Sequence, residues 1–187
     1  MSQQQHRSRR PHPYEEYRRN RGRWRPGGTL KTRRMAWTKV LVKVGKIEGP
    51  EGAERCFERI PKEVVDVFHY SVLLKVYVRA RDLRRAEGLF EKMRRAGIDP
   101  DDKTFNTLLS VYVATMNVDK AEDVLTRIRR AGIDPDDKTF NTLLSVYVAT
   151  QNETKAETVL RRMDRAGIPP NATTLTSLIQ LLSLIHI

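Results

Sequence analysis

The chain has 187 residues, a net charge of +12 and a single cysteine, Cys56. A lone cysteine excludes an internal disulfide framework and a cysteine-based zinc cluster, and the four scattered histidines include no pair at metal-ligand spacing. No run of about 18 apolar residues occurs, so the sequence predicts no membrane insertion.

The positive charge is concentrated at the N-terminus. Residues 1–34 contain ten Arg and one Lys against two Glu, a net charge of +9, whereas residues 35–187 carry a net charge of +3. A concentrated positive segment of this kind indicates a polyanionic partner, with nucleic acid ahead of an anionic membrane surface.

This N-terminal segment has no apolar period and is interrupted by Pro and Gly residues, so we expect an extended basic tail that is disordered on its own. Its aromatic residues lie among arginines, a mixture suited to phosphate pairing and stacking on bases. A solvated tail or a mitochondrial targeting peptide are alternatives, but Glu15, Glu16 and the lack of an amphipathic helix argue against the second. The tail residues predicted to bind RNA are Arg7, Arg9, Arg10, Arg18, Arg19, Arg21, Arg23, Trp24, Arg25, Arg33 and Arg34.

The rest of the chain is repetitive. The stretch RRAGIDPDDKTFNTLLSVYVAT occurs twice without a change, from Arg94 to Thr115 and from Arg129 to Thr150, at an offset of 35 residues. A fixed period of this size is typical of stacked repeats, in which each unit buries its apolar face only against its neighbours.

Each unit is predicted to be a pair of helices. In the first perfect copy, apolar residues at helical spacing define a first helix with Phe105, Leu108, Leu109 and Tyr112, and a second helix with Ala121, Val124, Leu125 and Ile128. Asn117 marks the turn between them. Gly132 is expected to end the second helix in a left-handed conformation, and Pro135 prevents its continuation.

The predicted boundaries divide residues 35–187 into units. The units cover about residues 34–66, which is short and degenerate, then 67–101, 102–136, 137–171 and an incomplete 172–187. We expect first helices to begin near Trp37, Tyr70, Phe105, Phe140 and Leu175. Cys56 occupies an apolar slot of its unit and is expected to be a packed core thiol. The last helix is apolar on more than one face, so either another molecule covers it or the chain is truncated.

A 35-residue unit that contains T-F-N-T-L-L, then A-E-x-x-L, then R-A-G-I-D-P-D resembles the pentatricopeptide repeat (PPR) family of organellar RNA-associated proteins. The resemblance implies an all-α, right-handed α-solenoid whose first helices line a concave groove. In the family, the fifth and the last residue of a unit contact one RNA base together, with the repeats reading RNA from 5′ to 3′. The implied pairs, which favour G, U, and C or U, are Ser71 with Asp101, Asn106 with Asp136, and Asn141 with Asn171.

The second position of each unit departs from the family. It is usually aliphatic, but here it is Phe68, Lys103, Lys138 and Thr173. Lysine cannot serve as an apolar wedge between bases, but it can meet a phosphate, so Lys103 and Lys138 are predicted to bind RNA. An alternative interpretation is that the Asn and Asp residues of the pairs are only helix-start and turn residues.

No catalytic signature accompanies these features. The sequence has no Gly-rich phosphate loop and no nucleophile or metalloprotease motif, so we expect no enzyme activity, no cofactor and no metal site. Glutamates recur at one position of the second helix and are expected to be solvated ion-pair residues, namely Glu54, Glu87, Glu122 and Glu157.

Three functions remain open. The leading hypothesis is a structural component of an organellar ribosome, in a mitochondrion or alternatively a plastid, that contacts rRNA through its N-terminal tail and has protein neighbours in that ribonucleoprotein. The second is a free organellar RNA-binding factor for transcript processing, stability or translation. The third is a protein-interaction scaffold in another organellar complex.

Overall fold

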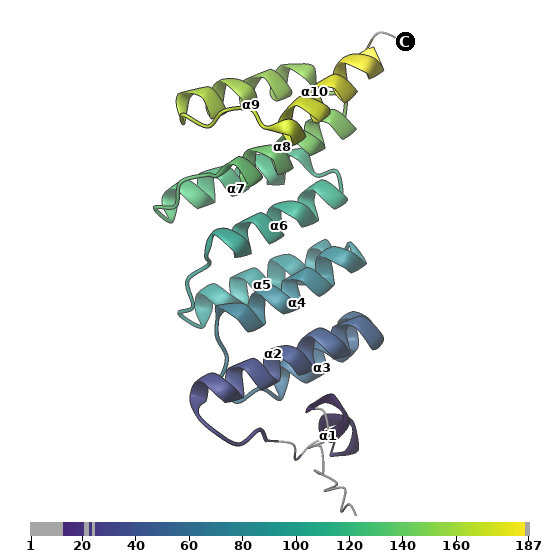
Figure 1. Ribbon diagram of the computed structural model, residues 1–187, viewed down its shortest axis with the longest axis vertical. Helices are drawn as coiled ribbons and strands as arrows, with labels where there is room; N and C mark the ends of the chain where they lie inside the picture. Colours follow the sequence, from purple (N-terminus) through teal and green to yellow (C-terminus); the bar gives the residue numbers. More distant parts are fainter. Residues whose placement is uncertain (1–12, 21–22, 24, 186–187) are drawn as a thin grey trace, which may run out of the picture. The chain divides into compact units, whose positions relative to one another are not determined.

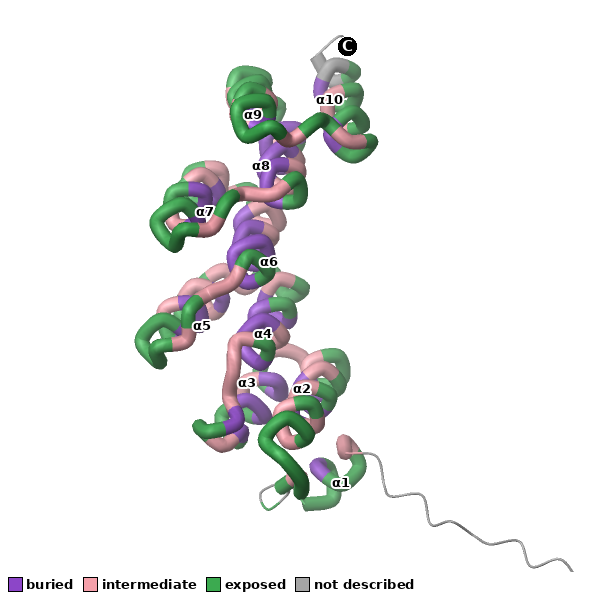
Figure 2. The backbone as a smooth tube through the Cα atoms, turned by 60° about the vertical axis from the view of Figure 1, so that its left-hand side comes forward, coloured by how far each residue is buried: buried purple, intermediate pink, exposed green. Residues whose placement is uncertain are grey.

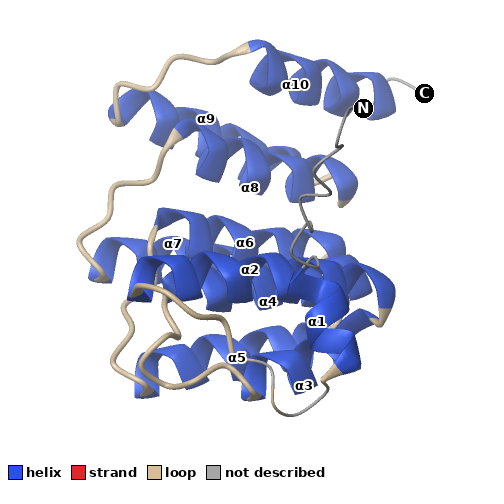
Figure 3. Cartoon of the chain, turned by 60° about the horizontal axis from the view of Figure 1, so that its bottom comes forward, coloured by secondary structure: helices blue, strands red, loops and turns tan. Residues whose placement is uncertain are grey.

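The computed structural model describes residues 13–20, 23 and 25–185, without the side chains of residues 182, 184 and 185. Within this part of the chain every regular element is an α-helix, as Figures 1 and 3 show. The chain divides into two compact units between Leu73 and Leu74. The predicted all-α class is confirmed.

The first unit contains α1 (Pro13–Arg19), α2 (Leu30–Ile47), α3 (Gly49–Glu58) and the first half of α4 (Val67–Ala80). α2 packs against both α1 and α3. Apolar side chains of α2 and α3 form its core, and the Phe57 and Tyr70 rings meet edge to face with centroids 4.9 Å apart. Cys56 is buried in this core, as predicted, and burial raises the pKa of its thiol to about 12.

The N-terminal segment is more helical than the sequence predicted. α1 lies inside the expected extended tail, and α2 begins at Leu30, five residues before the predicted start of the repeats. The physical reason is a helix cap: the Thr29 hydroxyl accepts a hydrogen bond from Thr32 N at 3.3 Å, which satisfies an N–H that the helix cannot pair itself. The closely spaced basic residues that follow concealed this start.

The second unit contains the rest of α4 and the six helices that follow it in the described part of the chain. These helices are α5 (Leu83–Arg95), α6 (Asp102–Ala114), α7 (Val118–Arg130), α8 (Asp137–Ala149), α9 (Glu153–Arg165) and α10 (Ala172–Ile185). α6 packs against α5, α7 and α8, and α8 packs against α9 and α10. The first helices α6 and α8 are therefore enclosed between neighbours, and among the described helices of this unit they contain the most buried residues (Figure 2).

The core of the second unit repeats the predicted apolar stripes. Leu108, Leu109 and Tyr112 of α6 are almost fully buried, and the stripe of α7 is buried opposite them. Burying one such side chain contributes about 1.5–3 kcal/mol. Since each helix pair buries its stripe against the next pair, the 35-residue period of the sequence becomes a period of packing.

The end of each second helix has the predicted geometry. Gly132 has φ of +71°, and Gly132 N donates to Arg129 O while Ile133 N donates to Ile128 O at 3.1 Å. These two bonds satisfy carbonyl groups that the helix leaves unpaired. Gly97 and Gly167 adopt the same conformation one unit earlier and later.

The turn inside each unit was not fully predicted. Asn117 is the N-cap of α7, where its Oδ1 accepts from Lys120 N at 3.2 Å, and the residue before it carries the turn. Arg81, Met116 and Gln151 each have φ of +53°, a left-handed conformation that non-glycine residues rarely adopt. Because three unrelated residue types occupy this position, no sequence pattern indicates the left-handed conformation.

Candidate nucleic-acid interface

Two of the three residue pairs implied by the family resemblance are in contact. Asn106 lies in the first turns of α6, and its Nδ2 donates to Asp136 Oδ1, just before α8, at 3.4 Å. One unit later, Asn141 Nδ2 donates to Asn171 Oδ1 at 3.3 Å. The same arrangement of side chains therefore recurs at the interval of one repeat.

The third pair stays a prediction. Ser71 is a buried residue of the first unit, whereas Asp101 belongs to the second unit. Asp101 is the N-cap of α6, where its Oδ1 accepts from Thr104 N at 2.8 Å.

Asp136 and Asn171 do have the helix-start role that the alternative interpretation assigned to them. Asp136 Oδ1 accepts from Thr139 N at 2.7 Å, and Asn171 Oδ1 accepts from Thr174 N at 3.1 Å. Both are N-cap bonds, worth about 1 kcal/mol each. One side chain thus caps its own helix and contacts the asparagine of the preceding first helix, so the two roles are compatible.

One threonine completes each cluster, and the sequence analysis had not singled out either of them. Thr139 Oγ1 donates to Asn106 Oδ1 at 2.8 Å, and Thr174 Oγ1 donates to Asn141 Oδ1 at 2.6 Å. The one available signal was the Thr that stands two residues before Asn in T-F-N, at Thr104 and Thr139; Thr174 lies in T-L-T and lacks it. The partner of Thr139 lies 33 residues away in the chain.

Charge distinguishes the two clusters. Partial burial acts to raise the pKa of Asp136, but hydrogen bonds from the Thr139 hydroxyl, Thr139 N and Asn106 outweigh it and hold this pKa below its usual value. Asp136 is therefore an anionic acceptor at neutral pH. Asn171 at the equivalent position is neutral, and its Nδ2 donates to Asp137 Oδ2 at 3.0 Å.

The residues at the second position are accessible. Lys103 and Lys138 are exposed, three residues before Asn106 and Asn141 on the same helices, and three residues is the spacing of one helix face. Neither ammonium group forms an ion pair within the described part of the chain. Thr173 is exposed at the same position of the last unit, and in the first unit Phe68 is 58% exposed.

The arginines of the tail divide into three groups. Arg18, Arg19, Arg23 and Arg25 are exposed, which leaves their guanidinium groups accessible. Arg33 and Arg34 lie in α2 and pair with Glu63 at 3.2 Å and Asp66 at 3.5 Å, so they are not part of a free tail. The remaining predicted residues lie outside the described part of the chain, namely Arg7, Arg9, Arg10, Arg21 and Trp24.

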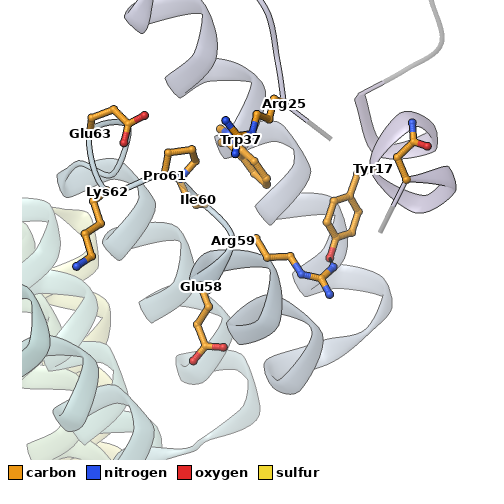
Figure 4. A pocket seen from close by; sticks show the side chains of 10 residues that line it. Tyr17, Arg25, Trp37, Glu58, Arg59, Ile60, Pro61, Lys62 and Glu63 are labelled. Atoms are coloured by element: carbon orange, nitrogen blue, oxygen red, sulfur yellow. Dashed lines mark hydrogen bonds between the residues drawn. The ribbon is translucent and has the colours of Figure 1, made fainter. Parts of the chain in front are cut away.

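Tyr14 and Tyr17 of the predicted tail pack against later residues of the first unit. Tyr17 is buried beside a hollow that is also lined by Arg25, Trp37 and Arg59, and Figure 4 shows the Arg59 guanidinium reaching the Tyr17 hydroxyl, to which it donates at 3.4 Å. Lys43 Nζ lies 5.6 Å from the centre of the Tyr14 ring. Tyr17 is therefore not available to stack on bases, contrary to the expectation from sequence.

Other kinds of site are not found among the described residues. No group of three or more His, Cys, Asp or Glu side chains in this part of the chain could hold a metal ion. None of the described helices has the length and apolar character needed to cross a membrane.

Helix pairs that stack at a period of 35 residues, with matched polar clusters on successive first helices, define a helical repeat protein. Residues 48–184 match a family model described as the pentacotripeptide-repeat region of PRORP. This match extends over more than half of the chain, so the chain belongs to the pentatricopeptide repeat family. Among curated proteins it is 33% identical over 71 residues to the chloroplastic pentatricopeptide repeat-containing protein At4g16390 of Arabidopsis thaliana, a match that covers 36% of this chain and 10% of that protein.

Solved structures of the family have the same architecture. The structure of PPR10 in complex with an 18-nt psaJ RNA element has a TM-score of 0.71 and 30% identity, over 83% of this chain and 23% of that chain. The PPR domain of Arabidopsis thaliana protein-only RNase P 1, in complex with tRNA, has a TM-score of 0.67 over 91% of this chain and 86% of that domain, and at 18% identity this likeness shows the fold alone. This chain spans about a tenth of the curated relative and less than a quarter of PPR10.

Proposed function

We propose that this chain binds single-stranded RNA through the first helices of its repeats and that it does so without catalysis. The observation that carries the proposal is the contact between Asn106 and Asp136, repeated one unit later between Asn141 and Asn171. Two convergent polar side chains per unit, at a fixed interval, suit the recognition of one base per unit. The similar PPR10 structure contains an RNA element, which supports the same use here.

The chemistry of each cluster selects among bases. Asn106 offers amide donors, and the ionised Asp136 can only accept. The Asn106–Asp136 cluster therefore suits a base with an N–H beside a carbonyl, as in uracil. The neutral Asn171 removes that demand and suits C or U. Lys103 and Lys138 are placed to meet phosphates beside the bases.

Equilibrium binding tests this function. The chain is titrated with short single-stranded RNAs that carry GUC in a constant surrounding sequence and with permutations of these three bases, at several salt concentrations. We expect tighter binding to GUC than to the permutations, with an affinity that falls as salt rises. Equal affinity for every permutation, or no binding at low salt, contradicts base reading by the repeats.

The cellular setting is a finer proposal. The exposed Arg18, Arg19, Arg23 and Arg25 add phosphate contacts, which favours a chain held in a large ribonucleoprotein such as an organellar ribosome, with rRNA as its ligand. The chloroplastic relative favours a plastid over a mitochondrion. Cross-linking in purified organellar ribosomes should place residues 18–25 on rRNA, whereas recovery of the protein only in free fractions rejects a ribosomal role and favours a free RNA-binding factor.

A further inference from the structure

The threonine at the third position of a unit lies between the two base-reading side chains. Thr139 and Thr174 are 3% and 0% exposed, in the first turns of α8 and α10. Each hydroxyl reaches back to the asparagine of the preceding first helix, at 2.8 Å to Asn106 Oδ1 and 2.6 Å to Asn141 Oδ1. Both threonines are more buried than the asparagines that they contact, since Asn106 is 5% exposed and Asn141 is half-buried. Any effect of the threonines on RNA must therefore act through these asparagines.

The orientation of an asparagine carboxamide decides what it offers to a base. Its two ends have nearly the same shape but opposite chemistry, because Oδ1 only accepts hydrogen bonds and Nδ2 only donates them. A rotation by half a turn exchanges a donor for an acceptor at the same place. A base-reading asparagine therefore needs partners that distinguish its two ends.

In the last described cluster, the polarity of the hydrogen bonds is fixed from both sides. The Asp137 carboxylate can only accept, and it receives Asn171 Nδ2 at 3.0 Å; the backbone Thr174 N can only donate, and it binds Asn171 Oδ1 at 3.1 Å. Asn171 Oδ1 in turn requires Nδ2 of Asn141 on its side, at 3.3 Å. Oδ1 of Asn141 then faces the Thr174 hydroxyl, which supplies the proton.

In the preceding cluster, Asp136 replaces Asn171 and the same orientation results. The Asp136 carboxylate requires Nδ2 of Asn106 on its side, and Asn106 Oδ1 faces the Thr139 hydroxyl. This hydroxyl also lies 2.6 Å from Asp136 Oδ1, so one proton serves two acceptor oxygens.

We propose that Thr139 and Thr174 are positioning residues that hold Oδ1 of Asn106 and Asn141 away from the RNA and leave a hydrogen on Nδ2 for a base carbonyl. The ligand is a base with a ring carbonyl, which C, U and G carry and adenine lacks; among these, C and U are the bases that the family resemblance implies for the two units. This inference rests on the proposed function, and it adds to that function the group that sets the preference of each unit.

The test compares a shape-conserving and a chemistry-conserving substitution. Thr139→Val keeps the volume and removes the hydroxyl, and Thr139→Ser keeps the hydroxyl; Thr174→Val and Thr174→Ser provide the matched set one unit later. For each variant of the full chain, Kd is measured for RNAs with C, U or A at the nucleotide facing Asn106 and, separately, at the nucleotide facing Asn141.

We expect Thr139→Val to reduce the preference for pyrimidine over adenine by about tenfold at the nucleotide facing Asn106 only, the order of one lost base contact. Thr174→Val should reduce this preference at the nucleotide facing Asn141 only. Thr139→Ser and Thr174→Ser should each keep the preference of the parent protein. The inference is overturned if the valine variants keep the preference or lose it equally at both nucleotides. It is also overturned if the serine variants lose the preference.

A second readout separates this inference from the proposed function. The side-chain amide signals of Asn106 and Asn141 in NMR spectra of the free protein report the carboxamide environment without RNA. Thr139→Val should shift or broaden the Asn106 signals alone, and unchanged signals overturn the positioning role. If the parent protein shows no base preference, the proposed function is wrong, and so is any effect of the threonines on base preference. The NMR signals still decide whether the threonines orient the Asn106 and Asn141 carboxamides.

Discussion

Tyr147 donates a hydrogen bond from its hydroxyl to Glu122 Oε1 at 2.6 Å, a contact between the first helix of one unit and the second helix of the unit before it. Tyr112 makes the same contact with Glu87 one unit earlier, at 3.0 Å. Burial and the adjacent carboxylate raise the pKa of Tyr147 above its ordinary value. These two glutamates were expected to be solvated ion-pair residues; they do form ion pairs, but their side chains are about one third exposed and accept a tyrosine hydroxyl as well.

The contact predicts a specific loss of stability. Tyr147→Phe removes one hydrogen bond to a charged acceptor that water can partly replace, so we expect the free energy of unfolding to fall by about 1 kcal/mol. Urea unfolding followed by circular dichroism measures it. Glu157→Gln is the matched control, because Glu157 stands at the position of Glu122 but is exposed and, among the described residues, pairs only with Arg161. Its effect should stay within about 0.5 kcal/mol. Equal effects of the two changes contradict the linking role of Tyr147.

The base preference of one unit should be convertible to that of the next. Asp136→Asn gives the Asn106–Asp136 cluster the same residues as the Asn141–Asn171 cluster. Asparagine still caps α8, so stability should change little. At the nucleotide facing Asn106, the preference should move from U toward C by about 1–3 kcal/mol, because the carboxylate no longer demands a base N–H. Competition binding with RNAs that differ at this nucleotide measures the change.

Asp164→Asn is the control for this prediction. Asp164 is an exposed residue of α9, and its substitution changes the net charge equally at a position outside both clusters. It should strengthen binding to all RNAs alike. A similar shift of base preference in both variants would indicate a general charge effect and would contradict readout by Asp136.

The first unit should lose stability in weak acid. Burial lowers the pKa of His69, although Asp66, whose Oδ1 lies 2.6 Å from His69 Nδ1, acts in the opposite direction. A lowered folded-state pKa means that the unfolded chain takes up a proton first, so this stability is present above about pH 6.5 and is lost as the pH falls through the folded-state pKa. The slope cannot exceed about 1.4 kcal/mol per pH unit for one proton.

Fluorescence of the buried Trp37, in a Trp24→Phe background, reports unfolding of this unit. His69→Gln should remove the slope between about pH 7 and pH 5 even if it lowers stability throughout. A slope that persists in His69→Gln assigns the acid sensitivity to another group.

The left-handed turn residue inside each unit is a site for stabilisation. Met116 has φ of +53° and is 59% exposed, so Met116→Asn relieves backbone strain and removes little packing. We expect a gain of about 0.5–1 kcal/mol in thermal unfolding. Gly132→Ala serves as the opposite case, since its φ is +71° and no atom lies within 4 Å of the added Cβ, and it should lose about 1 kcal/mol.

The features predicted correctly from the sequence are those defined by residue spacing within one repeat unit. The stripe around Leu108, the glycine end at Gly132 and the period of 35 residues each follow from spacing within one unit, and the structure confirms them. The contact of Asn106 with Asp136 was expected only through the family resemblance. The Thr139 and Tyr147 contacts were missed because they join residues far apart in the chain, which periodicity does not pair. Thr29 was missed because a cap depends on a single hydroxyl among basic residues.

Site-specific photocross-linking tests base reading by the repeats most directly. 4-Thiouridine is placed at the nucleotide assigned to Asn106 and Asp136, and the cross-linked peptide is identified by mass spectrometry. If the repeats read bases, adducts form in α6 and at the start of α8, and they move by one unit when the label moves by one nucleotide. Adducts confined to residues 18–25, or independent of the label's place, would contradict base reading.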